Sequence, residues 1–300
     1  MDWTVTLPLQ NRFPEARDAV VKFADIIAQR SGISGIASVG GLARGYVDKH
    51  SDLDLLVFGD VPGLGDLAWD FLEGMIKKGF LAELPPWAEK GALDVRDSKV
   101  WSFVKFRASP NKTIKELRIP ELDPFIVDLE LLDLESVRSG GPCEHWLLEY
   151  RWMLGHAWIP YDPSGAVQEL FTEAARYHPE DQTADLNDEA EAVHVAFHQG
   201  ETWILRGDPL SASFSIHGAL DHLVSTLYIA RGVHVPYGKW KAYYVRNLLP
   251  QGDPLFQELS ACLASPGCDL PKLRKHLERC RELKRKLYDR FDVKAKRKGL

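Results

Sequence analysis

Two acidic residues, Asp52 and Asp54, stand two positions apart at the start of an apolar run that continues to Phe58. Residues two apart in a β-strand project to the same face, so both carboxylates would lie side by side with Leu53 and Leu55 opposite. Two neighbouring carboxylates repel each other, and a divalent cation relieves that repulsion. Carboxylate oxygens are hard ligands that suit Mg²⁺. This acidic pair, Asp52 and Asp54, therefore predicts a magnesium site on one strand.

A glycine pair, Gly40-Gly41, follows the strand-like residues 33–39 and precedes a short expected helix. Without Cβ atoms the backbone can approach a ligand closely, and the N–H groups at a helix start attract phosphate. Each feature alone has an ordinary explanation, because Asp-x-Asp occurs in solvated turns and Gly-Gly in tight connections. Carboxylates at the edge of a buried strand, however, require a partner. Together the two pairs predict a site for a nucleoside triphosphate and its Mg²⁺.

The spaced motif Gly-Gly-x-x-x-Gly followed by Ser-Asp-x-Asp, within residues 33–58, resembles the polymerase β-like nucleotidyltransferase superfamily. That superfamily includes aminoglycoside nucleotidyltransferases and CCA-adding enzymes. Most members have Gly-Ser at this position, whereas CCA-adding enzymes have Gly-Gly, as this chain does. The resemblance implies that the glycine pair and Ser51 bind the nucleotide, and that the acidic pair holds two Mg²⁺ ions.

The resemblance also implies a third carboxylate on a later strand. The alternating run 125–132 offers Asp128 and Glu130 on one face. We favour Asp128, which would ligate only the metal near the acceptor and accept the acceptor's proton. Glu130 stays an alternative, because spacing along one strand does not tell which residue lies level with the acidic pair. A third interpretation is that both residues face solvent.

Two cations are further candidates for nucleotide binding. Arg44 lies one turn into the glycine-led helix, where it either contacts phosphate or forms a surface ion pair. Lys239, followed by Trp240, resembles a Lys-Trp element in the C-terminal domain of nucleotidyltransferases of the DUF4037 type. The resemblance implies that Lys239 binds the triphosphate. The alternative is an exposed lysine beside a packing tryptophan.

Hydrophobic periodicity predicts the elements that position these residues. The N-terminal part alternates helices and strands, which predicts an α+β fold with a mixed sheet and flanking helices. After 140–142 the pattern becomes helical, so we expect a nucleotidyltransferase domain at 1–139 and an all-helical domain at 140–300. The expected helices are 13–29, 64–78, 144–156, 166–177, 189–206, 211–230, 238–249 and 271–291; the expected strands are 33–39, 52–58, 98–107 and 125–132, with a loop at 81–97.

Composition limits the class of protein. The 300 residues are 45% apolar and include four cysteines without metal-site or disulfide-scaffold spacing. No signal peptide or membrane span is recognisable, so we expect a cytoplasmic protein. The net charge is −6, yet residues 272–298 carry +9, which leaves −15 elsewhere and excludes a wholly basic nucleic-acid surface. An apolar stripe at 273, 277, 280, 283, 287 and 291 indicates that the basic residues form the solvated face of a packed helix.

The sequence thus predicts a nucleotidyltransferase enzyme that transfers a nucleoside monophosphate from ATP, or another nucleoside triphosphate, to a hydroxyl group and releases pyrophosphate. The negative charge outside the basic segment suits a polycationic small molecule, for which an aminoglycoside-like compound is one candidate. The alternatives are the same chemistry on tRNA or a protein, and a catalytically silent, antitoxin-like binding module. A nucleic acid is not favoured, because its only support is the basic C-terminal segment. The sequence does not determine the oligomeric state.

Overall fold

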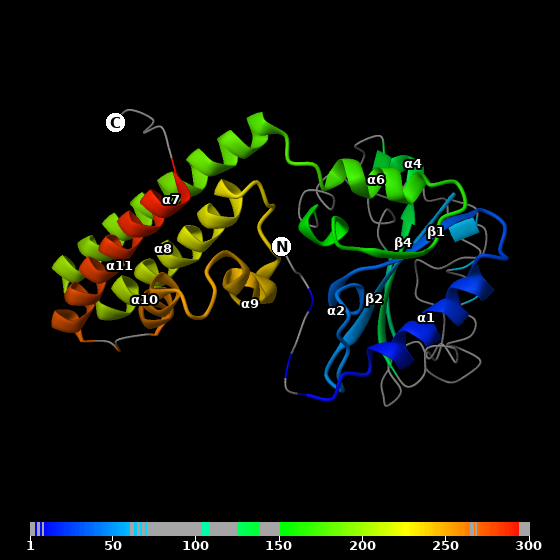
Figure 1. Ribbon diagram of the computed structural model, residues 1–300, viewed down its shortest axis with the longest axis horizontal. Coiled ribbons are helices and arrows are strands. Elements are labelled where there is room, and N and C mark those ends of the chain that lie inside the picture. Colours follow the sequence, from blue (N-terminus) through cyan, green and yellow to red (C-terminus); the bar gives the residue numbers. More distant parts are fainter. Residues whose placement is uncertain are drawn as a thin grey trace, which may run out of the picture. The chain divides into compact units, whose positions relative to one another are not determined.

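The computed structural model describes most of the chain and divides it into two compact units. The N-terminal unit is Trp3–Arg176, and the C-terminal unit is Tyr177–Leu300 with Met1–Asp2 (Figure 1). The described residues are 9–60, 104–108, 125–138, 151–264 and 269–293, with the single positions 4, 7, 63, 64, 67, 70 and 267.

A mixed five-stranded sheet forms the centre of the N-terminal unit, with strand order β3-β4-β2-β1-β5. β2 and β4 are parallel, and the other neighbours are antiparallel. This arrangement confirms the mixed sheet expected from the sequence. The strands are β1 (Ile33–Ser38), β2 (Asp52–Gly59), β3 (Val104–Ala108), β4 (Ile126–Asp133) and β5 (Trp158–Tyr161).

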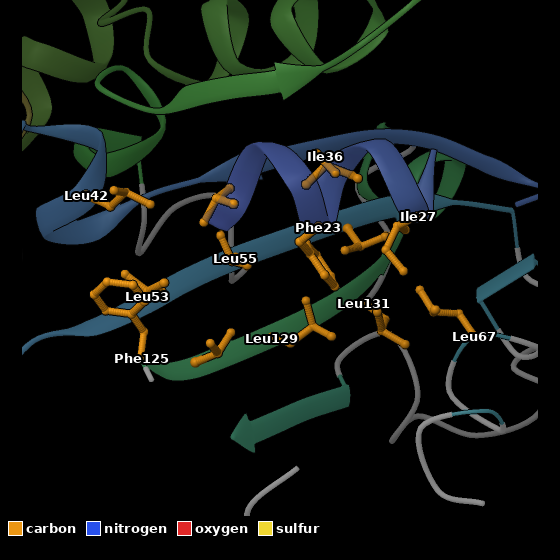
Figure 2. Packing of buried hydrophobic residues seen from close by; sticks show 14 of the residues in the cluster. Phe23, Ile27, Ile36, Leu42, Leu53, Leu55, Leu67, Phe125, Leu129 and Leu131 are labelled. Atoms are coloured by element: carbon orange, nitrogen blue, oxygen red, sulfur yellow. The ribbon is translucent and has the colours of Figure 1, made fainter. Parts of the chain in front are cut away.

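The long helix α1 (Phe13–Ile27) buries one face of this sheet. Its proline lies in the first turn, where no backbone N–H is needed, and its buried residues recur at helical spacing. Figure 2 shows Phe23 and Ile27 of this helix facing the leucines that alternate residues of β2 and β4 contribute. Because side chains alternate along a strand, the other face of β2 and β4 carries Asp52, Asp54 and Glu130 and, farther along, the buried Leu56, Phe58 and Leu132.

The strands expected at 33–39, 52–58 and 125–132 are confirmed as β1, β2 and β4 with ends shifted by at most one residue. The short helix expected after the glycine pair is α2 (Gly40–Ala43). β3 overlaps the expected strand 98–107. The helix expected at 64–78 and the loop at 81–97 lie mostly or wholly outside the described residues.

Residues 151–176 belong to the N-terminal unit, whereas the sequence placed them in an all-helical domain. Among them, β5 pairs with β1, and helix α6 (Ala166–Ala174) lies against β1 so closely that a Cβ on Gly35 would overlap the Val167 side chain. The compact units therefore divide after Arg176, while the boundary expected at 139 and 140 falls in a segment that the structure does not describe. Hydrophobic periodicity could not show this, because a four-residue edge strand is defined by its neighbour.

Every element described in the C-terminal unit is a helix, as expected. The helix α10 was not expected. The short helix α4 (Leu134–Arg138) belongs to the N-terminal unit, after β4. The C-terminal helices are α7 (Pro179–Arg206), α8 (Pro209–Ala230), α9 (Gly238–Leu248), α10 (Pro254–Leu263) and α11 (Leu270–Phe291).

The expected apolar stripe of α11 is confirmed, because all six of its residues are buried. Two of its basic residues pair with neighbouring helices: Arg281 with Glu201 of α7 at 2.7 Å, and Lys286 with Glu258 of α10 at 2.8 Å. The basic residues thus form a solvated, partly ion-paired face.

Across the described part of the chain, no helix combines the length and the hydropathy that a bilayer span requires.

Candidate active site

The glycine pair forms the turn that leads from β1 into α2, in the connection between β1 and β2. Gly40 has a φ of +69°, a left-handed conformation that favours glycine, and a Cβ there would overlap the Asp54 carboxylate. A Cβ on Gly41 would lie 2.7 Å from the Tyr46 carbonyl oxygen. Both positions therefore need glycine, and at Gly40 the missing side chain is what lets the turn lie against Asp54.

Backbone hydrogen bonds and packing fix this turn beside the start of β2. The Val39 N–H donates to the Asp54 carbonyl oxygen at 3.0 Å, which joins the end of β1 to β2. The N–H groups of Arg44 and Tyr46 both donate to the Gly41 carbonyl oxygen, at 3.0 and 3.1 Å. Leu42, 1% exposed, anchors α2 in the apolar core (Figure 2). The turn is thus supported independently of any ligand.

The acidic pair lies on the polar face of β2. Asp52 and Asp54 are half-buried, whereas Leu53 and Leu55 are fully buried in the core cluster beneath α1. Because residues two apart share a face, both carboxylates project from the side of the sheet opposite α1. This is the arrangement that the sequence predicted for the two residues.

The register of the parallel strands β2 and β4 places the candidate third carboxylates. Asp128 pairs with Asp54, and Glu130 pairs with Leu56, one alternation farther from the glycine pair. Glu130 is 8% exposed. The side chain of Asp128 lies outside the described part of the structure, but its backbone is level with Asp54, in the neighbouring strand at about 4.8 Å.

A buried carboxylate that sequence analysis did not single out, Asp48, organises the loop between α2 and β2. It is 7% exposed and accepts hydrogen bonds from the Tyr46 hydroxyl at 2.9 Å, the His50 N–H at 2.8 Å and the Ser51 hydroxyl at 3.1 Å. Although burial raises the pKa of Asp48, these hydrogen bonds outweigh it and lower the pKa below the ordinary value. Asp-x-x-Ser spacing before a strand is the local signal that indicates such a loop.

Ser51, a predicted nucleotide ligand, has its hydroxyl group in this same network. Its oxygen also accepts a hydrogen bond from the Asp48 N–H at 3.0 Å. The structure therefore gives Ser51 a place in holding the loop directly before Asp52. Its role in nucleotide binding stays a prediction.

Arg44 is buried, which differs from the surface ion pair considered as its alternative. Its side chain is covered to 5% exposure, and its guanidinium carbon lies 5.0 Å from the centre of the Trp152 ring. The Trp152 carbonyl in turn bonds the His156 Nδ1 at 2.7 Å. Burial, and next in the same direction the charge of Arg44, lower the pKa of His156, against the effect of the Trp152 hydrogen bond. No local sequence signal could have joined Arg44 to Trp152, since more than a hundred residues separate them.

Lys239 belongs to the C-terminal unit, whereas the glycine pair and the acidic pair belong to the N-terminal unit. It is exposed in the first turn of α9, with its Nζ 5.6 Å from the centre of the Trp240 ring. Its role as a triphosphate ligand stays a prediction.

The donor chemistry of the acidic pair fits a divalent cation. Mg²⁺ is commonly held by one or two carboxylates together with substrate phosphates, and Asp52 and Asp54 supply two carboxylates on one face. The missing side chain at Gly40 lets the backbone of the turn lie against the Asp54 carboxylate, where a Cβ would overlap it. Among the side chains that the structure describes, which do not include Asp128, no three His, Cys, Asp or Glu residues gather as a metal site.

Comparison with known proteins shows what this chain is similar to. A family model described as a nucleotidyltransferase domain matches residues 20–119, which include the glycine pair and the acidic pair. Among solved structures, the chain is similar to a nucleotidyltransferase-like protein from Exiguobacterium sibiricum 255-15, with 13% identity, a TM-score of 0.46, and coverage of 92% of this chain and 78% of that one. It is also similar to an aminoglycoside 6-adenyltransferase from Bacillus subtilis, with 12% identity, a TM-score of 0.34, and coverage of 94% and 91%.

No curated protein matches the chain. The family match covers the turn, the acidic pair, strands β1 and β2, and α1 from residue 20 onward. Residues 20–119 therefore match a nucleotidyltransferase domain, and this match supports a transferase activity.

Proposed function

We propose that this enzyme transfers AMP from ATP to a hydroxyl group of a small-molecule acceptor and releases pyrophosphate. The observation that carries the proposal is the contact between the Gly40 backbone and the Asp54 carboxylate, inside a domain that matches the nucleotidyltransferase model. This contact brings a turn suited to phosphate within reach of a carboxylate suited to a metal ion.

Each residue of the site has a role in this proposal. Asp52 and Asp54 would hold Mg²⁺, which when bound neutralises triphosphate charge and lowers the pKa of a nearby hydroxyl group. The glycine pair orients the triphosphate by letting it approach the backbone. Asp128 is the third carboxylate, because its register with Asp54 puts it level with the acidic pair, whereas Glu130 is one alternation farther along β4.

Asp128 would accept the proton of the acceptor hydroxyl group as its oxygen attacks the α-phosphorus. The new oxygen–phosphorus bond forms as the bond between the α-phosphorus and the bridging oxygen breaks, and the electron pair of that bond leaves with pyrophosphate. The positioned carboxylate and the fixed turn keep the reacting groups in line.

The charge distribution supports a cationic acceptor. The net charge is −15 outside residues 272–298, and two of the basic residues of α11 are paired with carboxylates of neighbouring helices. A negatively charged surface attracts polycationic molecules, so we propose an aminoglycoside-like compound as the acceptor class.

The proposal is tested by incubating the enzyme with Mg²⁺ and ATP labelled at the α-phosphate. Separate reactions contain a pool of polycationic small molecules, tRNA or lysate protein. We expect the label to appear on a small molecule and the Asp52→Asn variant to lose transfer. Asp18→Asn is the matched control, because Asp18 is an exposed carboxylate on α1. Transfer that persists in Asp52→Asn would show that the site lies elsewhere.

A further inference from the structure

The side chain of the buried Arg44 contacts Trp152, a residue that has no role in the proposed reaction. Trp152 lies in a helical turn at 151–154, directly before β5, and is 3% exposed. We propose that Trp152 is a positioning residue of the nucleotide site, which acts by holding the Arg44 guanidinium in place. This inference rests on the proposed function, since it concerns binding of MgATP at the glycine pair.

Arg44 is tied to the glycine pair through its backbone and to Trp152 through its side chain. Its N–H donates to the Gly41 carbonyl oxygen at 3.0 Å, so it closes the turn itself. Its guanidinium carbon is 5.0 Å from the centre of the Trp152 ring. A planar guanidinium stacks on an aromatic face, and the attraction grows when water is excluded, as it is around a side chain of 5% exposure.

His156 supports the same stack without adding charge to it. Its ring centre lies 5.0 Å from that of Trp152, and its Nδ1 carries a proton donated to the Trp152 carbonyl oxygen at 2.7 Å. Because burial, followed by the charge of Arg44, lowers the pKa of His156, the ring is neutral at pH 7. Arg44 therefore remains the positive charge of this three-residue stack.

A fixed, desolvated cation beside the turn favours triphosphate binding in two ways. Its field is screened less than that of a solvated side chain. Its side chain has also lost its rotamer freedom before the ligand arrives, so binding does not have to immobilise it. Removing the aromatic face of Trp152 should therefore weaken binding of MgATP even though Trp152 itself need not touch the nucleotide.

The test is isothermal titration calorimetry of the full chain with MgATP, which needs no acceptor. We expect Trp152→Met, which keeps bulk without an aromatic face, to raise the Kd about tenfold, and Trp152→Phe about threefold or less. Trp158→Leu is the matched control, because the guanidinium carbon of Arg17 lies 5.6 Å from the centre of the Trp158 ring in the same unit. The Kd of this variant for MgATP should equal that of wild type.

A double-variant cycle separates action through Arg44 from general disruption. If Trp152 acts through Arg44, adding Trp152→Met to Arg44→Gln should raise the Kd no further. The proposal is overturned if the effects of Trp152→Met and Arg44→Gln on the binding free energy are fully additive. It is also overturned if Trp152→Met lowers the Tm but leaves the Kd unchanged, because a merely structural role of Trp152 predicts that result. If Trp152→Met does not fold, Trp152→Phe in both backgrounds decides by the same criteria.

The two proposals fail in different ways. A wild-type chain that binds no MgATP overturns both the proposed function and the role of Trp152. A wild-type chain that binds MgATP, with tryptophan variants that bind equally well, overturns only the role of Trp152.

Discussion

Replacing Gly40 with alanine perturbs the contact on which the proposed function depends. Gly40 has a φ of +69°, and an alanine in this left-handed region costs about 1–2 kcal/mol. For a domain of this size, about 1 kcal/mol lowers the Tm by about 2–4 °C, so Gly40→Ala should lower it by about 2–8 °C. The backbone strain alone thus leaves a folded, measurable enzyme.

The added methyl group has a second effect, on the site itself. It would overlap the Asp54 carboxylate, which is on β2 and must then move away or push the turn outward. A displacement of about 1 Å in a catalytic group can reduce the rate about 100-fold. We therefore expect Gly40→Ala to lose about 100-fold in the rate of label transfer from α-labelled ATP, far beyond what the loss of stability explains.

Gly45 provides a matched control in the same loop. Its φ of +77° imposes the same strain on an alanine, but the nearest atom to a Cβ there is the Thr4 Cγ2 at 4.0 Å. Gly45→Ala should lower the Tm about as much as Gly40→Ala and keep nearly full activity. The reasoning is refuted if thermal unfolding shows equal losses in both variants and the two transfer rates are also equal.

Three further predictions concern the third carboxylate, His156 and the Asp48 loop. Asp128→Asn should reduce the transfer rate about 100-fold or more, because it removes the proposed proton acceptor, while Glu130→Gln should change it little. Since the folded-state pKa of His156 is below the unfolded value near 6.5, its contribution to stability is present above that pH and is lost as pH falls through the folded-state pKa. Asp48→Ala leaves buried donors unsatisfied and should destabilise the N-terminal unit by about 2–3 kcal/mol.

The measurements that check these predictions use different readouts. Initial rates with α-labelled ATP compare Asp128→Asn with Glu130→Gln, and a larger loss in Glu130→Gln would reverse the assignment. Unfolding in urea between pH 7.5 and 5 should show a smaller loss of stability in His156→Asn than in wild type; identical curves would contradict the histidine's role. For Asp48→Ala, a urea midpoint equal to that of wild type would show that the hydrogen bonds of Asp48 are not needed.

The pattern of the sequence was enough to predict the acidic pair, the glycine pair and the strands that carry them. Asp52 and Asp54 alternate with buried leucines, and that period of two is a local property of the chain. The conformational need for glycine at position 40 is local as well. Three of the expected strands could be predicted because a strand that buries one face has apolar residues at every second position of its own sequence.

Only the tertiary structure showed which residues from distant parts of the chain lie next to these strands and to Arg44. The parallel register that aligns Asp128 with Asp54, the edge strand β5 and the stack of Arg44 on Trp152 join residues far apart in the chain. Strand spacing fixes which residues share a face but not how far one strand slides along another, because register is set by packing and by the hydrogen bonds of the whole sheet. For this protein, the sequence determined the chemistry of the acidic pair, and the folded sheet determined which residues lie level with it.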